Sequence, residues 1–383
     1  MIKSILIAPD KFKGSLTSLE VCRAVEAGLR QHAEALTIIS LPMADGGDGL
    51  LDILSHYTAA TSHHATVTDP LGRPVEASWL LSADGRTAFV EMAQASGLHL
   101  LTPSEYDPLH ASTFGTGQLI AEAIRSGAKE IVIGIGGSAT NDGGMGMAAA
   151  LGFRFLDRQG AALPPGGGSL GRVAKIIGPG RPRDAREPAG APWPGIRFRV
   201  AVDVNNPLCG PQGATRVYAP QKGADADRLD SLEAGMQKYA AALNAFAGGD
   251  VAGREGAGAA GGLGAGCMAF LHAVPVRGID LVFEYSGAAR QIEQADLVIT
   301  GEGKIDEQTL QGKVVAGVAE LGRRYGKRVV AVCGQLTLTR DELDRLGIER
   351  AVALSELAAG PEDSMRRAAE WVQVAAGMLA EEL

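Results

Sequence analysis

The chain has few aromatic residues and few cysteines. Phe, Trp and Tyr together make up 5% of the 383 residues, and the four cysteines show no C-x-x-C spacing. Cysteines as far apart as Cys22, Cys209, Cys267 and Cys333 give no disulfide framework, so we expect reduced, mostly buried thiols in a cytoplasmic protein. The seven histidines form no H-E-x-x-H motif, which leaves a zinc site without support.

Positive charge and long apolar segments are also scarce. The formal net charge is -8 and no basic stripe is present, which argues against nucleic acid as a partner. The apolar run after Met1 is too short for a signal peptide, and residues 256–271 are mostly Gly and Ala and too short to span a bilayer. We therefore expect neither a nucleic acid nor a membrane as partner.

Apolar residues and glycines are abundant. Hydrophobic residues are 46%, charged residues 21% and glycines number 52, the balance of a soluble globular enzyme with many turns. Strand-like runs alternate with helix-like runs, which predicts an α/β protein with parallel sheets. The predicted strands are Ser4–Ala8, Thr37–Pro42, Ile131–Ile135, Phe198–Val202, Leu297–Thr300 and Val329–Cys333. The predicted helices are Ser18–Ala33, Thr116–Ser126, Asp227–Ala247 and Glu362–Leu379.

The length of the chain and a change of pattern predict two domains. Between Val67 and Glu91 the sequence has the turn residues of hairpins, whereas the simple strand–helix alternation returns from Asp296 onward. We expect one discontinuous domain, residues 1–66 and 286–383, and an inserted domain, residues 67–285. Gly160 to Gly195 is rich in Gly, Pro and Arg, and we expect a long exposed loop there.

The most distinctive motif lies between Lys129 and Gly152. An apolar strand leads into three glycines, a polar elbow from Ser138 to Asp142, and an Ala/Met-rich helix. This order brings backbone N–H groups up to a phosphate, and the carboxylate of Asp142 suits Mg²⁺. A tight turn with a helix N-cap explains the same residues. Gly134 to Ala139 also reads G-x-G-x-x-A, which leaves an NAD-dependent 2-hydroxy-acid dehydrogenase open.

Four further polar clusters follow predicted strands, where doubly wound sheets bind ligands. Each is also explained by an ordinary solvated turn, and no Walker A motif is present. The clusters are Asp10, Lys11, Lys13 and Ser15; Asp45 and Asp48; Asp203, Asn205 and Asn206; and Glu302, Lys304, Asp306, Thr309 and Lys313.

Taken together, the five clusters resemble the bacterial glycerate kinase family, the type without a P-loop. The matching stretches are Ala8–Leu16, Pro42–Gly49, Gly134–Gly144, Asp203–Pro207, Gly256–Gly266 and Thr300–Asp306, and they run in family order over almost the whole chain. Asp48 and Leu50 stand where Glu and Thr are usual, and Lys304 where Arg is common. Asp48 and Lys304 preserve charge, while Leu50 removes a hydroxyl and is given no ligand role.

The resemblance implies a fold and an activity. The fold is a flavodoxin-like domain built from both termini and an inserted α/β domain likened to restriction endonucleases. The activity is phosphorylation of D-glycerate that depends on ATP and Mg²⁺, with the 2-hydroxyl as the expected acceptor. Phosphorylation at the 3-hydroxyl, the dehydrogenase and a non-catalytic glycerate sensor stay open, as does the choice between monomer and homodimer.

The site roles follow from the chemistry of each residue, because phosphoryl transfer needs positioning and charge neutralisation. Residues expected to bind the nucleotide are Gly134, Gly136, Gly137, Ser138, Thr140 and Asn141. Those expected to bind glycerate are Lys13, Ser15, Asp48 and Asn205. The catalytic candidates are Asp45, Asp203 and Lys304, with Asp45 or Asp203 as base, and Asp142 and Asp306 are the Mg²⁺ candidates.

Overall fold

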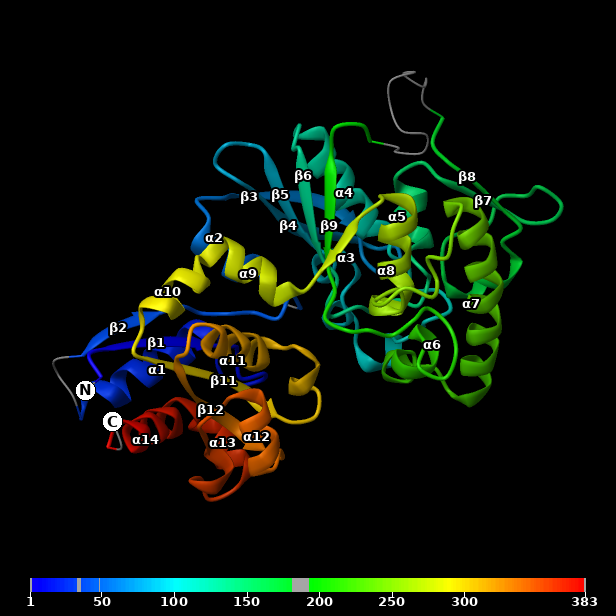
Figure 1. Ribbon diagram of the computed structural model, residues 1–383. Helices are drawn as coiled ribbons and strands as arrows, with labels where there is room; N and C mark the ends of the chain where they lie inside the picture. Colours follow the sequence, from blue (N-terminus) through cyan, green and yellow to red (C-terminus); the bar gives the residue numbers. More distant parts are fainter. Residues whose placement is uncertain (1, 33–35, 48, 181–192, 382–383) are drawn as a thin grey trace. The chain divides into compact units, whose positions relative to one another are not determined.

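The computed structural model describes residues 2–32, 36–47, 49–180 and 193–381 (Figure 1). The chain divides into two compact units: Met1–Asp45 with Arg277–Leu383, here unit 1, and Gly46–Val276, here unit 2. The sequence prediction places these limits at residues 66/67 and 285/286. Both units contain parallel strand pairs and helices, so the predicted α/β class is confirmed.

Unit 1 contains a five-stranded parallel sheet in the order β13-β12-β11-β1-β2. Its strands are β1 (Ser4–Pro9), β2 (Thr37–Ser40), β11 (Leu297–Ile305), β12 (Arg328–Leu336) and β13 (Arg350–Ala353). In chain order this is the 2-1-3-4-5 arrangement of flavodoxin-type sheets, whose switch point lies between the first and third strands. Here the switch point is the β1–β11 pair, in which Ala8 lies opposite Thr300.

The helices of unit 1 are α1 (Ser18–Arg30), α9 (Gly278–Ser286), α10 (Ala288–Gln294), α11 (Val314–Arg324), α12 (Arg340–Leu346), α13 (Pro361–Arg366) and α14 (Ala368–Ala380). Of these, α1, α10, α11 and α14 contact the strands of the sheet. A capping box of Thr17 and Glu20 starts α1, which packs closely on α14. The predicted helix Glu362–Leu379 is two helices because Arg367 has φ -110° and ψ 28°. The predicted helix end at Ala33 lies outside the described residues.

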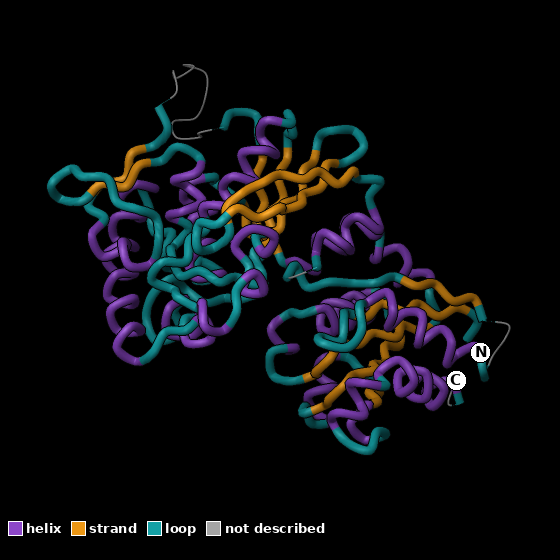
Figure 2. The backbone as a smooth tube through the Cα atoms, turned by 180° about the vertical axis from the view of Figure 1, so that it is seen from behind, coloured by secondary structure: helices purple, strands orange, loops and turns teal. Residues whose placement is uncertain are grey.

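Unit 2 contains a six-stranded mixed sheet in the order β10-β9-β6-β5-β4-β3. Figure 2 shows the strands in orange. The strands β3 (Thr61–Thr68), β4 (Pro74–Leu81) and β5 (Thr87–Glu91) pair antiparallel, and β5, β6 (Glu130–Gly134), β9 (Arg197–Ala201) and β10 (Val274–Val276) pair parallel. The predicted hairpin turns between Val67 and Glu91 are thus confirmed. The helices are α2 (Leu50–Tyr57), α3 (Ala93–Ser96), α4 (Phe114–Arg125), α5 (Met145–Ala150), α6 (Ala214–Tyr218), α7 (Ala226–Ala247) and α8 (Ala259–Phe270).

The prediction of a long exposed loop from Gly160 to Gly195 is wrong for its described first half. A 3-10 helix, Gly167–Arg172, buries Leu170 against α7, and β8 (Lys175–Ile177) pairs with β7 (Arg154–Leu156). Apolar residues spaced along this segment, such as Leu170 and Val173, join the core of unit 2. Residues 181–192 of the predicted loop lie outside the described residues.

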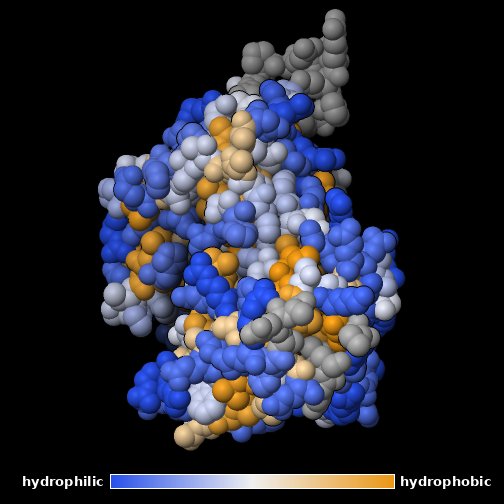
Figure 3. Space-filling view, turned by 90° about the vertical axis from the view of Figure 1, so that its left-hand side faces the viewer, coloured by the Kyte–Doolittle hydropathy of each residue, from blue (hydrophilic) through white to orange (hydrophobic). Residues whose placement is uncertain are grey.

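Among the described residues, the large apolar side chains that are exposed are Val217, Phe246, Val274, Leu310, Met365, Val374 and Met378. On the face shown in Figure 3 hydrophobic residues form small patches separated by hydrophilic residues. Within the described ranges, no helix has both the length and the apolar character that crossing a bilayer requires.

The start of α8 has an unusual backbone. Ala260, Gly261 and Gly262 adopt left-handed conformations, and Gly143 N donates a hydrogen bond to Gly261 O at 3.0 Å. A Cβ at Gly261 would lie 2.0 Å from the Thr140 carbonyl oxygen, so this position requires glycine. The small-residue segment therefore packs directly against the polar elbow of the glycine motif.

We expect Ala260→Gly to stabilise the protein. Ala260 has φ 54° and ψ 42°, a conformation that costs an L-residue about 1–2 kcal/mol, whereas glycine adopts it freely. Part of this gain is offset by the greater entropy of unfolded glycine, so the free energy of unfolding should rise by about 1 kcal/mol. Denaturant unfolding measures it, with Ala259→Gly as a matched, destabilising control. An Ala260→Gly protein less stable than wild type would contradict the argument.

Candidate active site

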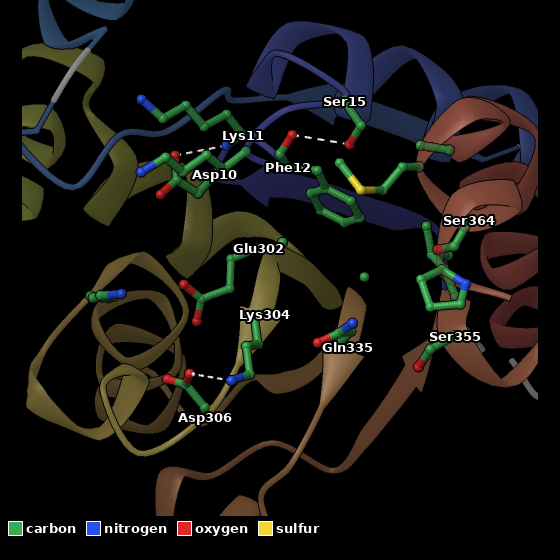
Figure 4. Close-up of a pocket in the computed structure, with 18 of the residues that line it drawn as sticks. Asp10, Lys11, Phe12, Ser15, Glu302, Lys304, Asp306, Gln335, Ser355 and Ser364 are labelled. Atoms are coloured by element: carbon green, nitrogen blue, oxygen red, sulfur yellow. Dashed lines mark hydrogen bonds and ion pairs between the residues drawn. The ribbon is translucent and has the colours of Figure 1, made fainter. Parts of the chain in front are cut away.

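A cavity of about 410 Å³ lies in unit 1 beside the carboxyl ends of β1 and β11 (Figure 4). This is the switch point of the sheet, where open α/β sheets bind their ligands. The β1–α1 loop contributes Asp10, Lys11 and Lys13, and the end of β11 contributes Glu302 and Lys304. The cavity thus combines acidic and basic side chains from segments about 290 residues apart.

Four acidic residues line this cavity: Asp10, Asp45, Glu302 and Asp306. Asp10 and Glu302 are only 6% and 5% exposed. Burial, followed by the charge of Asp45, raises the pKa of Asp10 to about 8. Burial also raises the pKa of Glu302 to about 7, with the charges of Asp45 and Asp306 adding to the effect and the Thr309 hydrogen bond and Lys313 opposing it. The cavity therefore holds groups that can take up a proton near neutral pH.

Backbone pairing positions these carboxyls. Asp10 N donates to Gly301 O at 2.8 Å, which extends the β1–β11 pairing by one residue. Leu41 N and Met43 N donate to the carbonyls of Ile7 and Pro9, and so carry the chain after β2 along β1 toward Asp45. Asp10 and Asp45 therefore follow two adjacent strands, β1 and β2, beyond the carboxyl ends of both.

A threonine orients Glu302. Thr309 is fully buried, and its Oγ1 donates to Glu302 Oε1 at 2.6 Å while accepting a hydrogen bond from Asp306 N at 3.1 Å. A carboxylate held by a third group in this way is suited to act as a general base. In Figure 4 Glu302 lies between Asp10 and Lys304, among the side chains that line the cavity.

Four lysines surround the carboxyls: Lys11, Lys13, Lys304 and Lys313. Lys304 Nζ lies 3.2 Å from Asp306 Oδ2, and Lys313 Nζ donates to Gln308 Oε1 at 3.1 Å. Several cations around one cavity suit an anionic ligand.

The cavity brings together five of the residues predicted from the sequence: Lys13, Ser15, Asp45, Lys304 and Asp306. The Ser15 hydroxyl donates to Phe12 O at 3.0 Å and so also stabilises the β1–α1 loop. Asp48 lies outside the described residues.

Sequence reasoning assigned no role to two of the acids, Asp10 and Glu302. Both belong to clusters recognised in the sequence, and their position directly after, or at the end of, a buried strand was the available signal.

The glycine motif of unit 2 has a different organisation from the predicted phosphate loop. Asp142 is fully buried; its Oδ2 accepts from Thr113 N, Thr113 Oγ1 and Gly146 N at 2.8–3.1 Å, and its Oδ1 accepts from Gly144 N at 3.1 Å. The first N–H groups of α5 therefore meet this carboxylate and not a phosphate. We assign Asp142 to holding the turn, in place of the predicted Mg²⁺ role.

Only part of this motif is accessible. Thr140 and Asn141 are fully buried, and Asn141 Nδ2 donates to Thr215 Oγ1 at 3.2 Å. Gly134 is buried within β6. The remaining nucleotide candidates, Gly136 to Ser138, form a partly exposed turn in which Gly137 has φ 72°. We call these three residues the glycine turn.

Asp203 and Asn205 also lie in unit 2, in the loop after β9, where Asp203 is half-buried and Asn205 is exposed. Neither lines the cavity of unit 1. The neighbouring Asn206 accepts from the Tyr218 hydroxyl at 2.7 Å and donates to Gln212 O at 2.7 Å, so it fixes the loop that contains Asp203.

A model of the glycerate kinase family matches residues 5–383. The chain belongs to the glycerate kinase family. It is 43% identical over 369 residues to a glycerate kinase of Bacillus subtilis, covering 96% of this chain and 94% of the relative. It is 44% identical over 333 residues to the glycerate 2-kinase of Escherichia coli, covering 87% and 85%. The crystal structure of a Salmonella typhimurium protein described as glycerate kinase 2 superposes with a TM-score of 0.81 at 40% identity, covering 100% and 98%.

Membership of the glycerate kinase family makes the protein an enzyme, a kinase. Of the three alternatives left by the sequence, the dehydrogenase and the non-catalytic sensor are thereby set aside, whereas phosphorylation at the 3-hydroxyl stays open. The structure also argues against a dehydrogenase. A dinucleotide pyrophosphate binds the N–H groups at a helix N-terminus, and here the Asp142 carboxylate accepts those hydrogen bonds.

A kinase that uses ATP needs oxygen ligands for Mg²⁺, and the cavity offers carboxylates for this purpose. Within the described ranges, no three His, Cys, Asp or Glu residues gather as a ready metal cage. Mg²⁺ does not need one, because it keeps several waters and binds one or two carboxylates together with substrate phosphates. Asp10 and Asp45 supply two carboxylates close enough for one charge to raise the pKa of the other group. These residues fit the ion.

Proposed function

We propose that the protein transfers the γ-phosphoryl group of ATP to the 2-hydroxyl of D-glycerate, giving 2-phospho-D-glycerate. The observation that carries this proposal is the Glu302 carboxyl, oriented by Thr309 in a cavity surrounded by lysines. The name of the Escherichia coli relative, glycerate 2-kinase, supports the 2-hydroxyl as acceptor.

In this proposal Glu302 accepts the proton of the attacking hydroxyl. A pKa of about 7 allows it to be ionised near neutral pH and still to hold a proton. Lys13 binds the carboxylate of glycerate, and Lys304 neutralises charge on the transferred phosphoryl group. Glu302 thus replaces Asp45 and Asp203 as the proposed general base, because it is buried and oriented by a hydrogen bond. Asp203 is the second candidate for the base.

Asp10 and Asp45 would hold Mg²⁺ together with the phosphates of ATP. The ion would neutralise phosphate charge when bound. Asp306 would position Lys304, because its carboxylate forms an ion pair with Lys304 and accepts a hydrogen bond from Gln308 N at 2.9 Å.

The glycine turn of unit 2 would contact ATP phosphates. Its glycines allow close approach of the backbone, and the Ser138 hydroxyl adds a side-chain donor. The buried residues Gly134, Thr140 and Asn141 would support the turn from within.

The test is incubation of the full chain with ATP, Mg²⁺ and D-glycerate, followed by ³¹P NMR identification of the product. The expected product is 2-phospho-D-glycerate, formed with one ADP per molecule and absent when EDTA is added. Formation of 3-phospho-D-glycerate would overturn the regiochemistry, and ATP hydrolysis without phosphoglycerate would overturn the choice of acceptor. L-Glycerate is the matched control for the acceptor.

Replacing Lys13 by Ala should weaken glycerate binding. Lys13 is exposed and lines the cavity, and a lost charge-assisted contact to a carboxylate costs about 1.5–3 kcal/mol. We therefore expect the KM for glycerate to rise about ten- to a hundred-fold with little change in the KM for ATP. Initial-rate kinetics measures both, and Lys129→Ala, an exposed lysine that does not line the cavity, is the control. A selective rise in the KM for ATP would assign Lys13 to the nucleotide.

A further inference from the structure

Lys222 of unit 2 is a buried lysine that the proposed reaction leaves unused. It ends the 3-10 helix Pro220–Lys222 and is only 1% exposed. Its Nζ donates to Ser138 Oγ at 2.6 Å and to the Thr140 carbonyl oxygen at 2.7 Å. Both acceptors belong to the glycine motif, so the whole polar end of this side chain is directed at one turn.

The burial of this lysine is costly. Burial lowers the pKa of Lys222 to about 7, although the charge of Asp142 acts in the opposite direction. The acceptors that Lys222 Nζ contacts are both uncharged, a hydroxyl and a backbone carbonyl. A buried cation held mainly by a hydroxyl and a carbonyl is unfavourable for stability, which indicates that its position serves binding.

The hydrogen bond to Ser138 fixes the direction of a second donor. A hydroxyl has one hydrogen to donate and two lone pairs, whereas an ammonium group only donates. Because Ser138 Oγ accepts from Lys222, its own hydrogen is left to donate to another group. Beside it, the fully buried Thr140 Oγ1 has no hydrogen-bond partner among the described residues. The motif therefore contains two hydroxyls whose hydrogen bonding is incomplete.

We infer that Lys222 is a positioning residue for the nucleotide: it holds the glycine turn, leaves the Ser138 hydrogen to donate and places a positive charge beneath the phosphates of ATP. This inference rests on the proposed function, in which the glycine turn contacts those phosphates. Gly137, with φ 72°, lets the backbone N–H groups of the same turn approach an anion. Lys222 then acts on ATP through Ser138 and through its charge.

The experiment compares Lys222→Met with Ser138→Ala and with Lys238→Met, an exposed lysine on α7 as the matched control. Met preserves the length of the side chain and removes both the donors and the charge. We expect Lys222→Met to raise the KM for ATP about ten- to a hundred-fold, the scale of a lost charge-assisted hydrogen bond, while the KM for glycerate changes less than two-fold. In the double variant Lys222→Met with Ser138→Ala, the rise in the KM for ATP should be smaller than the product of the two single rises, because both substitutions remove the same hydrogen bond.

A second readout separates this inference from the proposed function. ATP binding alone raises the melting temperature of a protein that binds it, so the ATP-induced shift needs no turnover. A smaller shift in Lys222→Met and in Lys222→Gln supports the inference even if glycerate is not the acceptor. If Lys222→Met does not fold, the KM for ATP and the ATP-induced shift in melting temperature are measured on Lys222→Gln and Ser138→Ala instead, and the same outcomes apply. An unchanged KM for ATP and an unchanged ATP-induced shift in a folded Lys222 variant would overturn it.

Discussion

Replacing Glu302 by Gln is expected to lower kcat by about 10²–10⁴-fold, with the KM values for ATP and glycerate little changed. Gln has nearly the same shape and can keep the hydrogen bond with Thr309, but it cannot accept a proton at neutral pH. In the wild type the ionised carboxylate is the active form. Because burial raises the pKa of Glu302 to about 7, kcat/KM for glycerate should fall as the pH decreases through that region. The residual rate of the variant should lack this dependence.

Glu307→Gln is the matched control, because Glu307 is exposed and close in sequence but does not line the cavity. It should leave kcat within two-fold of wild type. A Glu302→Gln enzyme with kcat within ten-fold of wild type would remove Glu302 as base. The same comparison with Asp45→Asn and Asp203→Asn would then identify the base.

Asp10→Asn is expected to stabilise unit 1 at alkaline pH while impairing activity. The pKa of Asp10 is raised from 3.8 to about 8, first by burial and then by Asp45, so the ionised form is unfavourable in the folded state. Stability from the protonated form is complete below about pH 4 and is lost as the pH rises through about 8. At about 1.4 kcal/mol per pKa unit, the rise from 3.8 to about 8 corresponds to a gain of roughly 6 kcal/mol for the variant at pH 9, on the order of 10 °C in Tm.

The measurement is the Tm of both proteins from pH 4 to 9 in the presence of EDTA, with little difference expected at pH 4 and a difference that grows as the pH rises. Asp306→Asn is a control with the opposite sign. Partial burial acts to raise the pKa of Asp306, but the hydrogen bonds from Gln308 N and Lys304 outweigh it and lower the pKa. Its removal should therefore destabilise slightly at neutral pH. An Asp10→Asn protein that is less stable than wild type at pH 9 would contradict the argument. A gain in stability with a loss of activity is typical of groups kept for function.

The secondary structure was predictable where burial is encoded locally. Apolar runs such as Ser4–Ala8 and Leu297–Thr300 form strands because both faces of a parallel strand are covered. Local patterns did not contain the break at Arg367, or the burial of Leu170 in a segment rich in Gly, Pro and Arg. Both features depend on what the segment packs against.

The candidate site was predictable in its residue types and less so in its roles. Polar residues at strand ends marked Lys13, Asp45 and Lys304, all of which line the cavity. The importance of Asp10 and Glu302 depends on the pairing of β1 with β11, which no local pattern states. For Asp142 the sequence motif predicted a metal ligand. In the structure its carboxylate instead accepts hydrogen bonds from the backbone N–H and the hydroxyl of Thr113, 29 residues away in the sequence.

The interior position of β1, between β11 and β2, has a consequence for biosynthesis. Its partner β11 begins about 250 residues after the first segment of unit 1 ends, and unit 2 is contiguous between them. At roughly 5–20 residues per second, an emerging chain waits on the order of 15–50 s between the two. During that interval unit 2 can fold alone, while one edge of the Ser4–Pro9 strand has no partner. Slow translation of the middle of the gene would lengthen the time for which this apolar strand edge stays unpaired.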